Sequence, residues 1–206
     1  MLKKYIPNSM MYITLLTVQE TIGKNGLNAI LNYTSLTKYR DNFPPNDDKL
    51  EVPGTDFTRI QGGIIDIFGE RGARSILYKA GRRGFQLVIE KNPTLLGLMG
   101  IGLKLLSKRK RLEKVFELGA ESNNKIFGEN QRFYVTDEGF VCELFDCYWC
   151  KGLTSEGPIC FGEAGLDAEV AKWASGDEHE VREVLCRARG DDVCKFVISL
   201  EPKVED

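Results

Sequence analysis

The sequence predicts an α+β fold in which N-terminal helices pack on a C-terminal antiparallel β-sheet. Residues 1–128 carry apolar side chains mainly at helical spacing, whereas residues 129–206 contain two hairpin patterns around turn residues. Helices grouped first and strands grouped last are typical of this class. A chain of 206 residues can bury one substantial core, so we expect both parts to form one compact domain.

The first part begins with two expected helices and a loop. Ser9 is suited to cap a helix over residues 10–22, and Gly23 is suited to end it. A second helix is expected over residues 27–33. The polar segment that follows contains two adjacent prolines and cannot continue a helix, so we expect a surface loop over residues 42–55.

Two packed helices are expected next, from Asp56 to about Val88 with a break near Gly72. Glycines inside them favour caps and simple helix crossings, and the alternative is that they allow close backbone approach or bending. The basic run 103–118 predicts either the solvated face of a helix with an apolar core side or, joined to residues 95–103, an amphipathic segment facing a membrane or a partner. We favour the solvated face.

The last part predicts two hairpins separated by a short helix. Residues 132–136 and 140–145 flank Asp137-Glu138-Gly139, which is a turn signal. A helix is expected over residues 167–174 and ends at Gly176. Residues 179–188 and 193–200 then form the second hairpin around Arg189-Gly190-Asp191.

Composition indicates an ordinary globular protein. The formal net charge is -2 and 42% of residues are hydrophobic, which does not favour a nucleic-acid partner. The most apolar stretch, residues 95–106, is shorter than the roughly 20 residues of a membrane span, so no integral membrane segment is expected. No signal peptide pattern is present at the start, which predicts a cytoplasmic protein with reduced cysteines.

Four residues near the end have the chemistry of a metal site: Cys160, Glu183, Cys186 and Cys194. In a tight second hairpin Cys186 lies opposite Cys194, close enough for two thiolates to share one zinc. Glu183 would lie on the other face of a regular strand, so a bulge near residue 184 or 185 is required. Four protein ligands would make this a closed, structural zinc site. The alternative is that the cysteines are buried apolar residues.

A Cys-x-x-Cys pair, Cys147 and Cys150, leaves more than one interpretation open. It predicts buried or free thiols, a redox pair, a second metal half-site, or ligands that join the same metal in place of Glu183. No β-α-β pattern surrounds it, so thioredoxin-like chemistry is not favoured.

The segment 147–198 resembles the 4-vinyl reductase domain, which is named after a bacteriochlorophyll biosynthesis protein and also occurs in the sensor regions of phenol- and xylene-responsive activators. The residues that carry the resemblance are Cys147-x-x-Cys150-x-Gly152, Pro158-x-Cys160, Gly165 and Glu183-x-x-Cys186-x-Ala188-x-Gly190-Asp191-x-x-Cys194-x-Phe196.

The resemblance implies a fold like that of TRAPP vesicle-tethering subunits, commonly dimeric, with an antiparallel sheet and helices enclosing a hydrophobic ligand pocket. It also implies zinc at Cys160, Glu183, Cys186 and Cys194. A phenol-binding histidine cannot be aligned, because the only histidine is His179. The chain has no room for ATPase and DNA-binding modules, so a response would pass to a downstream protein partner.

These observations predict a non-catalytic sensor or carrier that binds a hydrophobic small molecule. The candidate pocket residues are aromatic, with ordinary core packing as the favoured alternative for each one: Phe68, Phe85, Phe133, Trp149, Phe161 and Trp173. Catalysis is not favoured, because no dinucleotide or phosphate-binding motif is recognisable. The alternatives are a 4-vinyl reductase or accessory protein of tetrapyrrole biosynthesis, and a dimeric structural adaptor without a ligand.

Overall fold

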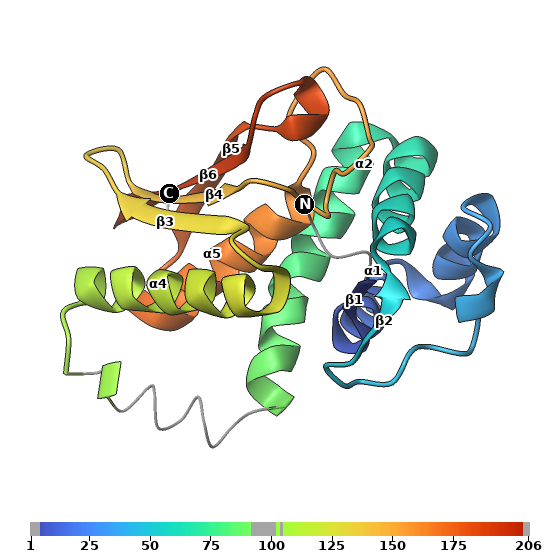
Figure 1. Ribbon diagram of the computed structural model, residues 1–206, viewed down its shortest axis with the longest axis horizontal. Coiled ribbons are helices and arrows are strands. Elements are labelled where there is room, and N and C mark those ends of the chain that lie inside the picture. Colours follow the sequence, from blue (N-terminus) through green and yellow to red (C-terminus); the bar gives the residue numbers. More distant parts are fainter. Residues whose placement is uncertain (1–4, 92–101, 104, 204–206) are drawn as a thin grey trace.

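The computed structural model describes residues 5–91, 102–103 and 105–203. It confirms an α+β fold, with α4 (Lys108–Phe127) and α5 (Phe161–Ser175) packed on a four-stranded antiparallel sheet (Figure 1). No helix of the described residues has the length and apolar character to cross a bilayer. The expected amphipathic segment 95–103 lies almost wholly outside the described residues.

The chain starts with a small sheet and a bent helix. Strand β1 (Tyr5–Pro7) pairs antiparallel with β2 (Leu50–Pro53), which lies inside the segment expected to be a loop. Helix α1 (Asn8–Tyr33) is bent at Gly23, where φ is 78°, as a glycine allows and other residues rarely adopt. Its cap residue is Pro7 rather than the predicted Ser9. A short 3₁₀ turn, η1 (Thr37–Tyr39), follows.

Helix α2 (Gly54–Lys91) forms the centre of the helical part and is bent once. The bend is at Gly69, with φ 66°, and not at Gly72, which stays helical. The expected break was therefore misplaced, because both glycines permit a bend and only one takes a positive φ. In α4 the apolar side is buried through Leu112, Val115 and Phe116, as expected for a core-facing helix. Leu105, an apolar residue of the run 103–118 expected on this core side, is instead 89% exposed, because it lies before the helix begins at Lys108.

The main sheet has the strand order β3-β4-β6-β5, formed by β3 (Gln131–Val135), β4 (Phe140–Leu144), β5 (His179–Leu185) and β6 (Cys194–Pro202). The first predicted hairpin is confirmed, with Val135 opposite Phe140. The loop of the second hairpin is longer than predicted. It contains the 3₁₀ turn η2 (Arg187–Arg189) and Gly190, whose φ is 100°.

Helices α2 and α5 cross at a point where glycines allow backbone contact. A Cβ atom added to Gly81 would lie 2.0 Å from the carbonyl oxygen of Gly162, and one added to Gly165 would lie 2.1 Å from that of Tyr78. Helix α5 begins at Phe161, six residues before the predicted start, and its C-cap is Gly176 as expected. The crossing brings the first turns of α5 beside the middle of α2 and fixes two sides of a cavity.

Candidate ligand cavity and cysteine cluster

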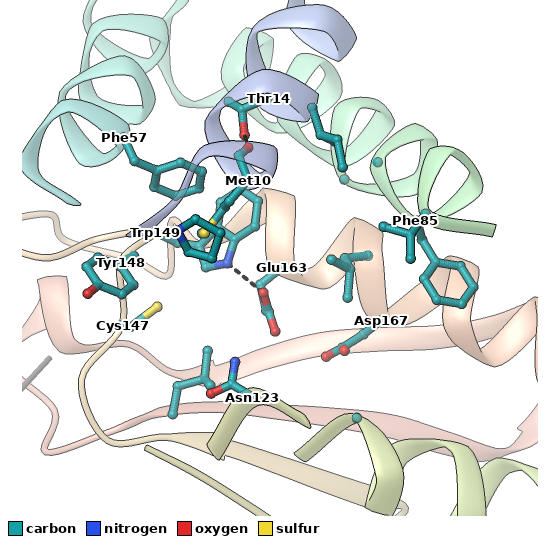
Figure 2. A pocket seen from close by; sticks show the side chains of 18 of the residues that line it. Met10, Thr14, Phe57, Phe85, Asn123, Cys147, Tyr148, Trp149, Glu163 and Asp167 are labelled. Carbon is teal, nitrogen blue, oxygen red and sulfur yellow. Dashed lines mark hydrogen bonds between the residues drawn. The ribbon is translucent and has the colours of Figure 1, made fainter. Parts of the chain in front are cut away.

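A cavity of about 470 Å³ lies among α1, α2, α4 and α5 (Figure 2). This volume is in the range of small-molecule sites, which are mostly apolar with a few polar groups. Much of the wall is apolar, and it includes Met10, Ile13, Phe57, Leu77, Phe85 and Val170. Tyr148 and Trp149, from the loop after β4, close one side.

The cavity has a polar end on helix α5. Glu163 and Asp167 are one helical turn apart, so their side chains share a face, and Figure 2 shows both directed into the same space as Asn123. The indole Nε1 of Trp149 donates a hydrogen bond of 2.5 Å to Glu163 Oε2. The polar end therefore combines two carboxyl groups, an amide and an indole.

Several buried polar atoms of the cavity lining have no hydrogen-bond partner within the described part of the chain. They are Asp167 Oδ2, Asn123 Oδ1 and both amide atoms of Gln61, whose side chain also lines the cavity. Buried polar atoms are normally satisfied by protein or by a bound molecule. The unpartnered atoms identify the place where a ligand's polar group would fit.

Burial keeps the two acids of the cavity protonated to unusually high pH. It raises the pKa of Glu163 to about 7. Burial, and then the charge of Glu163, raise the pKa of Asp167 well above its ordinary value. Among the described residues, no lysine, arginine or histidine lines the cavity, so no cationic side chain of the lining compensates a negative charge there. A protonated carboxyl can donate one hydrogen bond and accept others.

The raised pKa of Glu163 predicts that the free energy of unfolding falls as the pH rises, and that Glu163 causes part of this fall. Because its folded-state pKa of about 7 exceeds its ordinary value of 4.5, its contribution is fully present below about pH 4.5 and is lost as the pH rises through 7. Glu163→Gln should remove up to about 3 kcal/mol of that decrease. Urea unfolding of wild type and variant at about pH 5 and pH 8 measures the difference, and equal decreases would contradict the assignment.

Two of the predicted pocket aromatics, Phe85 and Trp149, line the cavity. The other four lie outside its lining. Phe68 is 40% exposed, and Phe133 stacks on Phe116 and Phe140. The Phe161 ring lies under the Arg74 guanidinium, and Trp173 packs edge-on against Phe85.

The acid pair was missed at the sequence level, although a signal existed. Glu163 and Asp167 are four residues apart in a segment that is otherwise rich in alanine and glycine. Acids on the apolar face of a helix are rarely buried without a reason. Phe57 and Tyr148, which also line the cavity, carry no comparable signal.

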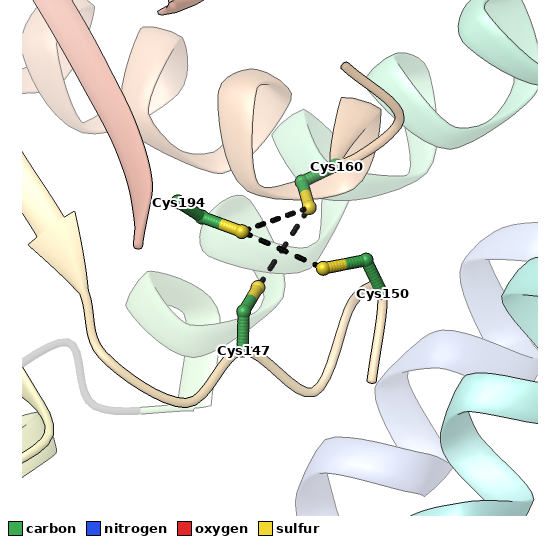
Figure 3. A group of neighbouring side chains, drawn as sticks. All are labelled: Cys147, Cys150, Cys160 and Cys194. Carbon is green, nitrogen blue, oxygen red and sulfur yellow. Dashed lines mark hydrogen bonds between the residues drawn. The ribbon is translucent and has the colours of Figure 1, made fainter. Parts of the chain in front are cut away.

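Five of the six cysteines gather in a buried cluster beside the cavity, and all are free thiols. Two overlapping sets each have all ligand atoms within 4.8 Å of one another, the set of Cys147, Cys150, Cys160 and Cys194 and the set of Cys160, Glu183, Cys186 and Cys194. Figure 3 shows the sulfurs of the first set converging from the loop after β4, the start of α5 and the start of β6. The structure thus brings the four predicted ligands together and adds both cysteines of the Cys-x-x-Cys pair.

The spacing of the sulfurs is that of tetrahedral metal coordination. The sulfur separations are 3.7 Å for Cys147 and Cys160, 3.5 Å for Cys150 and Cys194, 3.9 Å for Cys160 and Cys186, and 3.8 Å for Cys160 and Cys194. Sulfurs bound tetrahedrally about 2.3 Å from one zinc lie about 3.8 Å apart. The cysteines could therefore hold a metal ion.

Glu183 reaches the cluster through the bulge that the sequence required. The pairing of β5 with β6 shifts register between Glu183 and Leu185, and this turns the Glu183 side chain toward Cys186. Its Oε2 accepts the backbone N–H of Cys160 at 2.8 Å, while Oε1 is buried without a hydrogen-bond partner in the described residues. An unpartnered carboxylate oxygen beside three thiols suits a cation.

Backbone hydrogen bonds hold the loop that carries the last ligands. Asp191 Oδ2 accepts the Cys186 N–H at 2.8 Å, and the Arg187 N–H points to Cys194 Sγ at 3.4 Å. The left-handed Gly190 lets the chain return from η2 to β6. The Gly190-Asp191 pair of the sequence motif therefore positions two ligands and is not itself one.

Comparison with solved structures finds H-NOX domains with the same fold. A variant of Tt H-NOX is 15% identical, with 98% of each chain covered and a TM-score of 0.58. An H-NOX protein from S. oneidensis in the Fe(II)NO ligation state is 12% identical, with 93% of this chain and 99% of that chain covered and a TM-score of 0.54. A variant H-NOX protein from K. algicida, in the Fe(II) unliganded state, is 12% identical. The match covers 94% of this chain and 96% of that chain, with a TM-score of 0.56. The shared fold, also that of TRAPP-like ligand-binding proteins, confirms the predicted fold class.

One matched H-NOX structure bears on haem distortion, and a haem in this cavity would need a lining residue that can bind its iron. Haem iron is held in proteins by histidine, cysteine, methionine or tyrosine. No histidine lines the cavity in the described ranges, because His179 lies on β5 with Nδ1 2.9 Å from the Ser199 carbonyl oxygen. Cys147 lines the cavity, but its sulfur belongs to the cluster. These residues do not fit a histidine-ligated haem, and none is assigned.

Sequence comparison adds a curated relative and a family model. Uncharacterized protein MJ0745 of Methanocaldococcus jannaschii is 28% identical over 95 residues, which is 41% of this chain and 52% of the relative. The chain thus matches about half the length of that relative. The family model of the 4-vinyl reductase domain matches residues 140–200, from the start of β4 into β6, including every cysteine. Residues 140–200 therefore belong to the 4-vinyl reductase domain family, in agreement with the resemblance found in the sequence.

Proposed function

We propose that this protein is a non-catalytic sensor or carrier that binds an apolar small molecule bearing an N–H or O–H group at one end. The observation that carries the proposal is the apolar cavity whose one polar end has unpartnered atoms. An apolar body would replace water along the wall, which is favourable in proportion to the area buried. The polar end would then select among molecules of similar shape.

The donor group follows from the chemistry of the polar end. Asn123 Oδ1 and the side-chain oxygen of Gln61 are acceptors, and the Asp167 carboxyl keeps acceptor capacity even when it is protonated. Gln61 Nε2 is an unpartnered donor, which a ligand O–H group can also satisfy as an acceptor. A basic amine would gain most, because its charge would also favour ionisation of Glu163 or Asp167. An anionic ligand would meet four acidic lining residues, Glu163 and Asp167 among them, and no lining cation among the described residues, so it is disfavoured.

The second part of the proposal is a structural zinc at Cys160, Glu183, Cys186 and Cys194. Three soft sulfur ligands and a carboxylate suit zinc, and four protein ligands leave no position for substrate water. The site would join the start of α5 to β5 and β6, which the described hydrogen bonds connect only in part. Zinc would thereby stabilise the fold and not perform chemistry.

Ligand binding is tested by fluorescence in a Trp173→Phe background, which leaves Trp149 as the reporter at the cavity wall. A panel should pair amines and alcohols with hydrocarbons of the same size. We expect saturable quenching and a raised melting temperature with the N–H or O–H compounds, and at least tenfold weaker binding by the hydrocarbons. The tenfold ratio corresponds to about one charge-assisted hydrogen bond.

A blocked cavity supplies the matched comparison. Ala80 lines the cavity on α2, so Ala80→Phe fills it, whereas Ile67→Phe places the same ring on the same helix at a position 40% exposed and outside the lining. Binding should be lost in the first variant and kept in the second. Equal binding by both variants, or no binding of any compound by the wild type, would contradict the proposal.

A homodimer, a downstream protein partner and a cytoplasmic location belong to the same proposal. A sensor acts by passing its response to another protein, and a cluster of free thiols is typical of a reducing compartment. Native mass spectrometry tests the dimer together with the bound metal and ligand. A monomer at micromolar concentration would remove the dimer from the proposal and leave the cavity unaffected.

A further inference from the structure

The cysteine cluster contains more ligands than one metal ion can use. Five thiols and one carboxylate lie together, and a tetrahedral ion takes four. If only Cys160, Glu183, Cys186 and Cys194 held an ion, Cys147 and Cys150 would stay as buried thiols in contact with its ligands. The sulfurs of Cys147 and Cys150 would therefore be left without an ion, although they lie as close to the other sulfurs as the ligands of one zinc lie to each other.

We propose that the cluster holds two zinc ions that share Cys160 and Cys194 as bridging thiolates. The two ligand sets overlap in these two residues and in no other. Two tetrahedral ions need eight bonds, and four terminal ligands with two bridging ones supply eight. Cys147 and Cys150 complete one ion, and Glu183 and Cys186 complete the other. This inference extends the structural zinc of the proposed function with a second ion.

The distances between the sulfurs agree with Cys160 and Cys194 bridging two ions. Cys160 is 3.7 Å from Cys147 on one side and 3.9 Å from Cys186 on the other, measured between sulfurs. The bridging pair itself, Cys160 and Cys194, is 3.8 Å apart, which is the distance expected for two ligands of one tetrahedral zinc. The sulfurs therefore already lie near ligand spacing, and a small approach of the Cys160 and Cys194 side chains would separate the two ions enough to share them.

Charge also favours two ions. Five thiolates and one carboxylate carry six negative charges, and two divalent ions leave a net charge of two negative, as in a single zinc site with three thiolates and a carboxylate. All the cluster cysteines are buried, and uncompensated thiolates would be costly there. The thiol protons are released to solvent as each ion binds. No other reactant is needed.

The second ion would support the cavity wall. Tyr148 and Trp149 lie between Cys147 and Cys150 in the chain and line the cavity, so an ion bound by both cysteines closes a short loop around them. Hydrogen bonds from the Thr58 hydroxyl to the Tyr148 carbonyl at 2.8 Å and from the Cys150 N–H to the Cys147 carbonyl at 3.4 Å hold the backbone of this loop, whereas the ion would fix the two cysteine side chains. Loss of the second ion should therefore disturb Trp149 while the first ion remains.

Metal counting tests the proposal. Protein purified with zinc and without chelator should contain two zinc per chain by native mass spectrometry and elemental analysis. Cys147→Ala and Cys150→Ala should each contain one. Cys142→Ala is the matched control, because Cys142 is also buried and lies outside both ligand sets, and it should keep two. Trp149 emission, read in the Trp173→Phe background, should shift in the first two variants only.

A titration of the metal-free wild type with Co²⁺ covers variants that fail to fold. Thiolate-to-cobalt absorption should rise until two equivalents are bound. Three results would overturn the proposal. They are saturation at one equivalent of Co²⁺, iron with inorganic sulfide in the purified protein, and two zinc ions retained by both the Cys147→Ala and the Cys150→Ala variants. A single zinc would still agree with the proposed structural zinc, and no zinc at all would contradict both, while the ligand titrations report separately on the cavity.

Discussion

Cys194→Ser is expected to remove the metal from the cluster and to lower the free energy of unfolding by more than about 5 kcal/mol. Cys194 belongs to both ligand sets and begins β6, and its sulfur lies 3.5 Å from that of Cys150 and 3.8 Å from that of Cys160. Structural zinc contributes on the order of 10 kcal/mol of apparent binding free energy to small domains. Urea unfolding followed by circular dichroism, together with zinc analysis of the same sample, measures both effects.

Cys142→Ser is the control for this experiment. Cys142 is in the middle of β4 and is 1% exposed, so serine there buries a hydroxyl at a cost of about 1–3 kcal/mol. It should keep the wild-type zinc content, because Cys142 is outside both ligand sets. If Cys194→Ser retained full zinc, or lost no more stability than Cys142→Ser, a structural metal at this cluster would be excluded.

The place of Glu183 in the cysteine cluster could be predicted from the sequence, whereas the place of Cys147 and Cys150 could not. The requirement for a bulge beside Glu183 came from strand geometry alone, and the observed register shift between Glu183 and Leu185 confirms it. The position of Cys147 and Cys150 could not be derived in the same way. Their loop meets α5 and β6 only in the tertiary structure, and local spacing does not say which segments become neighbours.

Element types were predictable from periodicity, whereas several boundaries were not. The hairpin of β3 and β4 is confirmed because alternation and a turn signal coincide there. The start of α5 was misplaced because Gly162 and Gly165 lower helix propensity, and their role becomes visible only in the crossing with α2. The pair β1 and β2 was missed because each strand is very short.

The cavity was the least predictable feature. Helical periodicity places aromatic residues on an inward face but does not distinguish a packed core from an open cavity. Phe133 and Trp173 are accordingly packed against other rings, while Phe85 lines the cavity. The polar end depends on Glu163 and Asp167 facing the same cavity as Asn123 from another helix, and one sequence cannot reveal that these distant segments line one space.

Gly165→Ala is expected to destabilise the protein by about 3 kcal/mol and to lower the melting temperature by roughly 6–12 °C. The added Cβ would lie 2.1 Å from the Tyr78 carbonyl oxygen, with its carbonyl carbon and Cα within 2.9 Å. These are backbone atoms, which cannot rotate away as a flexible side chain can. Helices α2 and α5 must therefore move apart, and because both form the cavity wall, ligand affinity should fall as well. Calorimetry and the fluorescence titration measure the two effects.

Gly119→Ala separates this clash from the ordinary effect of alanine in a helix. Gly119 is in α4, and a Cβ atom there meets nothing within 4 Å. Alanine in a helix interior is favoured over glycine by up to about 1 kcal/mol, so this variant should be slightly more stable than the wild type. The same intrinsic gain is present in Gly165→Ala and is outweighed only if α2 and α5 are in backbone contact. A Gly165→Ala variant as stable as Gly119→Ala would show that the helices are not packed this closely.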